Sequence, residues 1–154
     1  MTNLAEAFQQ TEVLQALKSL TPDKRLAYLW RANWVQTAHK HQIVPSGDWW
    51  SIWLMLAGRG AGKTRTAAEQ IGWWAWNEPE TRWLVAAPTS ADVRGTCFEG
   101  DSGLLSVIPK PLIEDYNKAY HELRLITARS SRASLPQSLS ASAGRSSTGL
   151  GAMS

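Results

Sequence analysis

The stretch Ile52-Trp-Leu-Met-Leu-Ala-Gly-Arg-Gly-Ala-Gly-Lys-Thr64 decides the fold that we expect for this chain. An apolar run, expected to be a strand, leads into a glycine-rich turn, and a helical pattern begins near Lys63. This order of strand, loop and helix is the context that a phosphate-binding P-loop requires. The glycines allow successive backbone N–H groups to point at one anion, and the helix N-terminus adds the positive end of its dipole.

The residues of the loop have expected roles in nucleotide binding. Lys63 would reach the β- and γ-phosphates of the nucleotide, and the Thr64 hydroxyl would help to hold Mg²⁺. The usual pattern opens with glycine where this chain has Ala57, so Gly58 and Gly60 must supply the freedom of the loop. The alternative is a glycine turn whose lysine is merely solvated.

Composition and charge set limits on the class of protein. The chain has 154 residues, of which 44% are hydrophobic and 19% charged, enough for one globular domain. Its single cysteine, Cys97, excludes an internal disulfide framework and a multi-cysteine zinc site, and suits a reducing cytoplasm. No apolar run approaches the roughly 18 residues of a membrane span, and residues 1–20 do not resemble a signal peptide.

The net charge of +3 does not by itself predict nucleic-acid binding. All 13 acidic residues lie in residues 1–128, together with all but three of the 16 basic residues. The remaining three, Arg129, Arg132 and Arg145, lie in the C-terminal tail. The basic excess is therefore a property of the tail and not of a basic face on the folded domain.

We expect an α/β fold in which an incomplete parallel sheet of the P-loop type is flanked by helices. A strand, a helix and a second strand in this order form a right-handed crossover between parallel strands. We divide the chain into a helical N-terminal lead (1–44), a partial P-loop ATPase domain (45–127) and a disordered tail (128–154). Ser, Ala, Arg and Gly dominate the tail, a composition that does not bury enough apolar surface to become ordered. The expected elements are helices over 3–20, 22–38 and 63–76, strands over 52–57 and 83–87, and a hairpin over 116–119 and 122–127.

Together these motifs resemble the N-terminal ATPase domain of phage terminase large subunits, the motors that pump DNA into procapsids. The resemblance covers roughly residues 25–127 and depends on the order and spacing of short segments. These segments are Gly47-Asp48-Trp49, Trp53-Leu54, the loop 57–65, Ala67-Ala68-Glu69, Trp73, Ala86-Ala87-Pro88-Thr89, Asp92-Val93-Arg94, Glu99-Gly100, Ser102-Gly103-Leu104-Leu105, Tyr116-Asn117 and His121-Glu122-Leu123.

The resemblance implies a set of residues that bind ATP and Mg²⁺. Arg59 would sense or stabilise the γ-phosphate in cis, whereas the alternative is a solvated loop cation. Gln42 and Trp49, with Pro45 between them, would contact adenine, and the alternative is simple packing of a Pro–Trp turn. The loop residues implied to bind the nucleotide are Gly58, Gly60, Ala61, Gly62, Lys63, Thr64 and Arg65, of which Thr64 also binds the metal.

The resemblance also implies partners and a location. In the intact family these are double-stranded DNA, a small terminase subunit and a portal protein, with no membrane involved. The location is the cytoplasm of a phage-infected or lysogenic bacterium. The segment Pro88-Thr89 with Asp92 and Arg94 resembles a motif that couples the nucleotide site to DNA, and its alternative is a strand-end turn with a helix cap.

The chain departs from the family in its acidic residues. A P-loop ATPase needs an aspartate for Mg²⁺ and a carboxylate that positions the attacking water, but no acid follows Glu122. The nuclease domain is missing as well. Synonymous codons can be chosen for the tail so that another reading frame of the same DNA encodes a peptide that ends in paired acidic residues. We therefore hypothesise that the chain is a terminase that is frameshifted after about Ala128. We expect negligible ATP turnover. The alternatives are another P-loop NTPase or a non-catalytic interaction protein.

Overall fold

A computed structural model describes residue 13, residues 15–126 and residues 148–152 of the chain. Residues 15–19 are helical, and the predicted helix over 3–20 otherwise lies largely outside the described residues. The elements that follow are α2 (Pro22–Thr37), η1 (Lys40–Gln42), α3 (Lys63–Asn77), β1 (Arg82–Ala86), α4 (Ser90–Asp92), η2 (Val93–Phe98), α5 (Leu104–Val107), η3 (Lys110–Leu112), β2 (Ile113–Asn117), β3 (Glu122–Leu125) and β4 (Thr148–Ala152).

Helix α2 begins where the sequence predicts it. The Thr21 side chain accepts a hydrogen bond from the Lys24 N–H at 3.4 Å, and Pro22 occupies the first helical position, where its missing N–H costs nothing. The buried side chains of α2 are Ala27, Trp30 and Trp34, which are spaced at three and four residues along one face.

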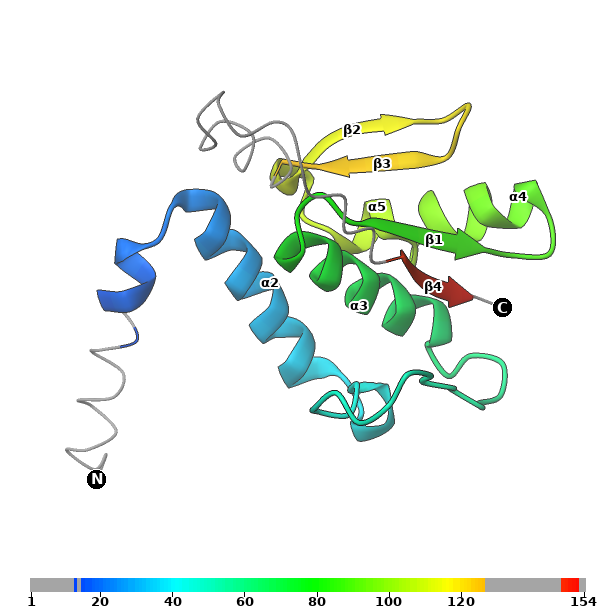
Figure 1. The fold of residues 1–154 in the computed structure, drawn as a ribbon, viewed down its shortest axis with the longest axis horizontal. Coiled ribbons are helices and arrows are strands. Elements are labelled where there is room, and N and C mark those ends of the chain that lie inside the picture. Colours follow the sequence, from blue (N-terminus) through cyan, green and yellow to red (C-terminus); the bar gives the residue numbers. More distant parts are fainter. Residues whose placement is uncertain (1–12, 14, 127–147, 153–154) are drawn as a thin grey trace.

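Helix α3 is the element around which the others pack. It lies between α2 and β1 (Figure 1), and it also contacts α5 and η2. At Gly72 two side chains of other segments come so close that a Cβ would lie 2.9 Å from Cη2 of Trp30 and 3.0 Å from Cδ1 of Ile108. The buried hydrophobic core consists of Ala27, Trp30, Ala68, Ile71, Trp76, Cys97, Phe98, Leu104, Val107, Ile108, Leu112 and Leu125.

Two small sheets are described. Strands β1 and β4 pair in parallel, from Arg82 opposite Thr148 to Ala86 opposite Ala152. Strands β2 and β3 form an antiparallel hairpin with an irregularity between Ile113 and Asp115. The hairpin is present as predicted, although its first strand begins before the predicted segment 116–119.

The predicted strand over 52–57 is not formed in the described part of the chain. The segment is extended, but β1 pairs with β4 and β2 pairs with β3, so no described strand provides hydrogen-bonding partners for it. Ile52, Leu54 and Leu56 are 84%, 71% and 86% exposed. The expected crossover unit of strand 52–57, helix 63–76 and strand 83–87 is therefore present only in its second and third elements.

The tail 128–154, which the sequence predicts to be disordered, is described only at residues 148–152. These residues form β4, because strand pairing uses backbone N–H and C=O groups and does not require large side chains. Residues 128–147 and 153–154 lie outside the described residues. Within the part that is described, no helix is both long and apolar enough to cross a membrane.

We predict that Gly72→Ala lowers the free energy of unfolding by about 1–3 kcal/mol, because the new methyl group has to displace Trp30 and Ile108. The matched control is Gly95→Ala in η2, where nothing lies within 4 Å of the new Cβ. Since alanine is the better helix former, the control should be neutral or stabilising by up to ~1 kcal/mol. Urea denaturation followed by tryptophan fluorescence measures both. Equal effects of the two changes would contradict the close approach at Gly72.

Candidate phosphate-binding loop

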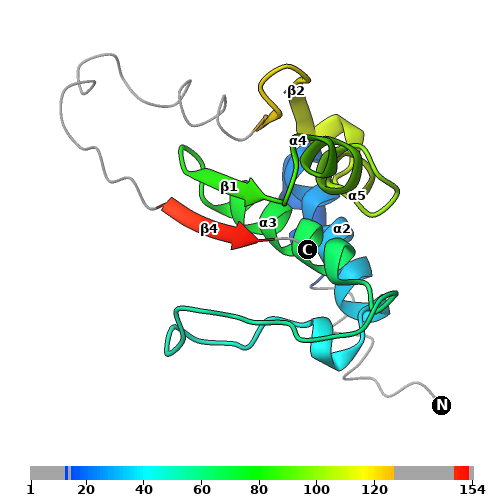
Figure 2. The same cartoon turned by 90° about the vertical axis from the view of Figure 1, so that its right-hand side faces the viewer.

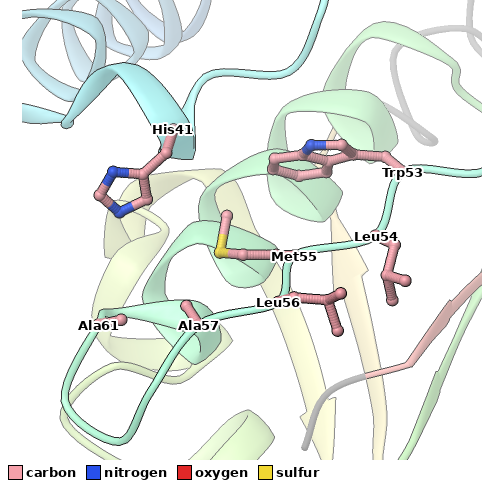
Figure 3. Close-up of a pocket in the computed structure, with 7 residues that line it drawn as sticks. All are labelled: His41, Trp53, Leu54, Met55, Leu56, Ala57 and Ala61. Atoms are coloured by element: carbon pink, nitrogen blue, oxygen red, sulfur yellow. The ribbon is translucent and has the colours of Figure 1, made fainter.

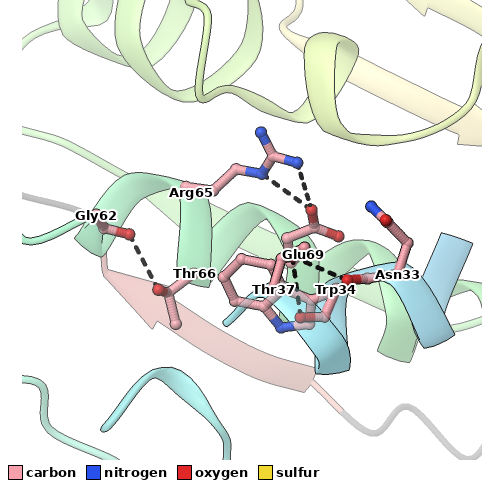
Figure 4. A network of polar contacts seen from close by, with 7 residues as sticks. All are labelled: Asn33, Trp34, Thr37, Gly62, Arg65, Thr66 and Glu69. Atoms are coloured by element: carbon pink, nitrogen blue, oxygen red, sulfur yellow. Dashed lines mark hydrogen bonds and ion pairs between the residues drawn. The ribbon is translucent and has the colours of Figure 1, made fainter. Parts of the chain in front are cut away.

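The loop between the extended segment 52–57 and α3 depends on two glycines with positive φ. Gly60 has φ +82° and Gly62 has φ +75°, in the left-handed region that residues with a Cβ rarely adopt. Gly62 is the residue before the helix, and its carbonyl accepts from both the N–H and the hydroxyl of Thr66, at 2.9 and 3.0 Å (Figure 4). The loop therefore delivers the chain directly into the first turn of a 15-residue helix.

Gln42 supports the loop from the side of η1. Its side chain is 7% exposed; the carbonyl Oε1 accepts the His39 N–H at 2.8 Å, and Nε2 donates to the Ala61 carbonyl at 3.4 Å. A Cβ at Gly62 would lie only 2.6 Å from Nε2 of Gln42. The structure thus brings Gln42 to the loop, where both ends of its amide contact backbone.

Lys63 folds back over the start of the loop. Its Nζ donates to the carbonyl of Ala57 at 3.0 Å and to that of Gly58 at 3.2 Å. An ammonium group has three donors, so one N–H remains beyond these two bonds. The positive charge is thereby held between the loop and the N-terminus of α3, where an anion is favoured.

The other predicted loop residues are arranged differently from one another. Arg59 is exposed at the tip of the loop, and Thr64 is half-buried in the first turn of α3. Arg65 forms an ion pair along the helix: its Nε and Nη2 each lie 2.9 Å from Oε1 of Glu69 (Figure 4). Its guanidinium group is therefore held on the flank of α3, a role that the sequence did not predict for Arg65.

Trp49 is not held at the loop by any described polar contact. It is 78% exposed, and its indole N–H donates to the Ser46 carbonyl at 3.1 Å within its own turn. Of the two residues predicted to contact adenine, only Gln42 has a described hydrogen bond to the loop backbone.

A cavity of about 420 Å³ lies beside residues 53–57, the segment that leads into the loop (Figure 3). His41 of η1 contributes to the cavity, and the sequence analysis assigned it no role. All five consecutive residues from Trp53 to Ala57 contribute to the cavity, so no alternating pattern in the sequence would have found it. The cavity is lined by His41, Trp53, Leu54, Met55, Leu56, Ala57 and Ala61.

The described residues provide little for a metal ion on their own. Among them, no group of three or more His, Cys, Asp or Glu side chains could hold one. Mg²⁺ usually keeps several waters and takes most of its other ligands from phosphate oxygens, so a single hydroxyl such as that of Thr64 fits this mode of binding. The residues present therefore fit a magnesium ion that arrives with a nucleotide, and not one held by protein carboxylates.

A buried polar cluster lies behind the loop, where α3 meets α2. Glu69 is 2% exposed; burial raises its pKa above the ordinary value, and the hydrogen bond and charge of Arg65 oppose that shift. On α2, Arg31 donates to Gln70 at 3.0 Å and lies 5.4 Å from the ring centre of Trp73. Burial lowers the pKa of Arg31, and the charge of Glu69 opposes this. The cluster ties the first two turns of α3 to α2.

Comparisons of the chain with protein-family models, with curated proteins and with solved structures found no match. The resemblance to terminases therefore depends on the motifs quoted above.

We predict that Gly62→Ala disrupts the loop, because a Cβ there requires an unfavourable positive φ and clashes with Gln42. Gly58→Ala is the matched control, since nothing lies within 4 Å of its Cβ and its φ is not positive. Amide chemical shifts of residues 58–66 should move widely in Gly62→Ala and only locally in Gly58→Ala. Similar, purely local shifts in both variants would contradict the described loop.

The pKa of Glu69 gives a prediction for stability against pH. Because the folded pKa is raised, the folded protein binds this proton more tightly, and stability falls as the pH rises above 4.5, the ordinary value. Glu69→Gln lacks this titration. The unfolding free energy of the wild type minus that of Glu69→Gln should therefore decrease as the pH rises from 4.5 through the folded pKa. Denaturation of both proteins across this range measures it, and a difference that increases with pH would contradict the burial effect.

Proposed function

We propose that residues 57–64 bind the phosphates of ATP. The observation that carries this proposal is the position of Lys63, the first residue of α3. Its ammonium group donates hydrogen bonds to the carbonyls of Ala57 and Gly58 at the start of the loop. A cation, a helix N-terminus and two glycines with positive φ meet at one place. Each of these features favours a phosphate group, and their combination is difficult to explain by a turn that only connects two elements.

In this proposal the residues of the loop share the work of binding. Backbone N–H groups of the loop and the first turn of α3 surround the phosphates, and Lys63 neutralises part of their charge. Arg59, exposed at the tip, is free to turn toward the terminal phosphate. A magnesium ion that accompanies the nucleotide would be held by the Thr64 hydroxyl, and when bound it would neutralise further phosphate charge.

We further infer that this chain corresponds to the ATP-binding portion of a DNA-packaging terminase large subunit. The order and spacing of the motifs over residues 25–127 support this. In that setting the partners are DNA, the small terminase subunit and the portal protein, and the location is the bacterial cytoplasm. Hydrolysis by this chain is expected to be negligible, because no acidic residue follows Glu122 to hold the metal and to position the attacking water.

The proposal is tested by titrating a fluorescent ATP analogue with Mg²⁺ into the wild-type chain, Lys63→Ala and Lys24→Ala. Loss of the Lys63 charge should weaken binding by at least ~tenfold, the effect of removing one charge-assisted hydrogen bond. Lys24 is exposed on α2, far along the chain from the loop, so its replacement should leave the affinity unchanged.

One result would contradict the proposed phosphate site, and another would contradict the expected lack of hydrolysis. Binding that is equal in Lys63→Ala and the wild type would exclude the loop as the phosphate site. Phosphate release above the level of a buffer blank, abolished in Lys63→Ala, would show that the chain hydrolyses ATP without the missing carboxylates.

A further inference from the structure

The buried carboxylate of Glu69 lies near two guanidinium groups and is bonded to one of them. Its Oε1 accepts from Nε and Nη2 of Arg65, both at 2.9 Å, on the same helix (Figure 4). The second guanidinium belongs to Arg31 of α2, which lies beside α3 in both views of the fold (Figure 1, Figure 2). Because Glu69 is 2% exposed, water cannot replace a cationic partner that it loses.

Two donors on α2 are buried next to this carboxylate without an acceptor. Nε1 of Trp30 and Nη1 of Arg31 have no hydrogen-bond partner among the described residues. Burial raises the pKa of Glu69, and both Trp30 and Arg31 oppose this rise, so both act on the same carboxylate. A buried donor without an acceptor is costly. Glu69 has an acceptor to offer, since its Oε2 takes part in no described hydrogen bond.

Arg65 is placed where it can leave Glu69 for the loop. It is the third residue of α3, two positions after Lys63, and its side chain is 41% exposed. Side chains of a helix lean toward its N-terminus, which here is the end at the loop. Arg65 extends the other way to reach Glu69, one turn later in the helix. An anion at the N-terminus of α3 therefore competes with Glu69 for this guanidinium group.

We propose that Glu69 exchanges Arg65 for Arg31 when a phosphate group occupies the loop. Arg65 turns toward the phosphate, and the carboxylate of Glu69 turns toward α2, where Nη1 of Arg31 and Nε1 of Trp30 donate to it. The carboxylate keeps a cationic partner throughout, so no buried charge is left unpaired. This inference rests on the proposed phosphate site, and it adds that occupancy of the loop changes the contacts between α3 and α2.

The exchange makes two substitutions act on nucleotide affinity in opposite directions. Glu69→Gln weakens the hold on Arg65, so the chain should bind a fluorescent ATP analogue with Mg²⁺ about fivefold more tightly, the lower end for coupled sites. Arg31→Met removes the second cation, so Glu69 retains Arg65 and binding should weaken about fivefold. Arg124→Met is the matched control, because Arg124 also pairs with a glutamate, Glu122 at 3.1 Å, but both side chains are exposed. Circular dichroism confirms that the variants keep their helices.

The exchange is also tested without any ligand. Arg65→Met removes the described partner of Glu69, so the carboxylate should turn to α2. The indole N–H resonance of Trp30, assigned with Trp30→Phe, should then move downfield, because the proton gains an acceptor. The same movement should appear in the wild type when an ATP analogue that resists hydrolysis is added with Mg²⁺. Arg124→Met should leave this resonance in place.

Three results would overturn the inference in distinguishable ways. An unchanged Trp30 resonance in Arg65→Met would exclude the exchange of partners. Weaker nucleotide binding in both Glu69→Gln and Arg31→Met would show that the cluster only stabilises the fold. A wild-type chain that binds no ATP analogue would refute the proposed phosphate site and the link to it, while Arg65→Met would still decide whether Glu69 exchanges its partner.

Discussion

The structure depends on the close packing of α3 at Gly72. Trp30 of α2 and Ile108, the residue after α5, both approach this glycine so closely that no Cβ would fit between them. Close contact on both sides allows α3 to be covered by apolar neighbours from earlier and later parts of the chain. Because interiors are packed nearly as densely as organic crystals, one methyl group at this position would separate all three segments.

The placement of α3 gives the candidate phosphate-binding loop its geometry. A loop of small residues does not hold its own shape, since glycine has the greatest backbone freedom of any residue. Here Gly62 is placed by the helix that follows it and by Gln42, which lies against it. The loop is therefore supported from the sides of α3 and η1, while the segment 52–57 before it has no strand partner in the described structure.

The buried cluster between α2 and α3 adds polar contacts to the apolar packing of these two helices. Glu69 is an expensive group to bury, and the cost is offset by Arg65 on the same helix and by the nearby charge of Arg31. The Arg65–Glu69 pair lies within α3, so the two helices are linked by the hydrogen bond from Arg31 to Gln70 and by the contact of Arg31 with the ring of Trp73. These contacts connect the second and third turns of α3 to α2.

The sequence by itself determined the elements whose signals are local. Thr21-Pro22 marks the start of α2, and the glycine turn before Lys63 marks the start of α3, because caps and φ preferences act within a few residues. The glycine turn could be predicted for the same reason, whereas the binding of phosphate by Lys63 stays a prediction. Only the tertiary structure decided which segments far apart in the sequence pair or pack with each other. An apolar run such as 52–57 becomes a strand only when another strand supplies hydrogen bonds, and residues 148–152 form β4 because β1 supplies them. The burial of Gln42 likewise depends on packing between segments, which no local pattern specifies, whereas the i, i+4 pair of Arg65 and Glu69 is local to α3.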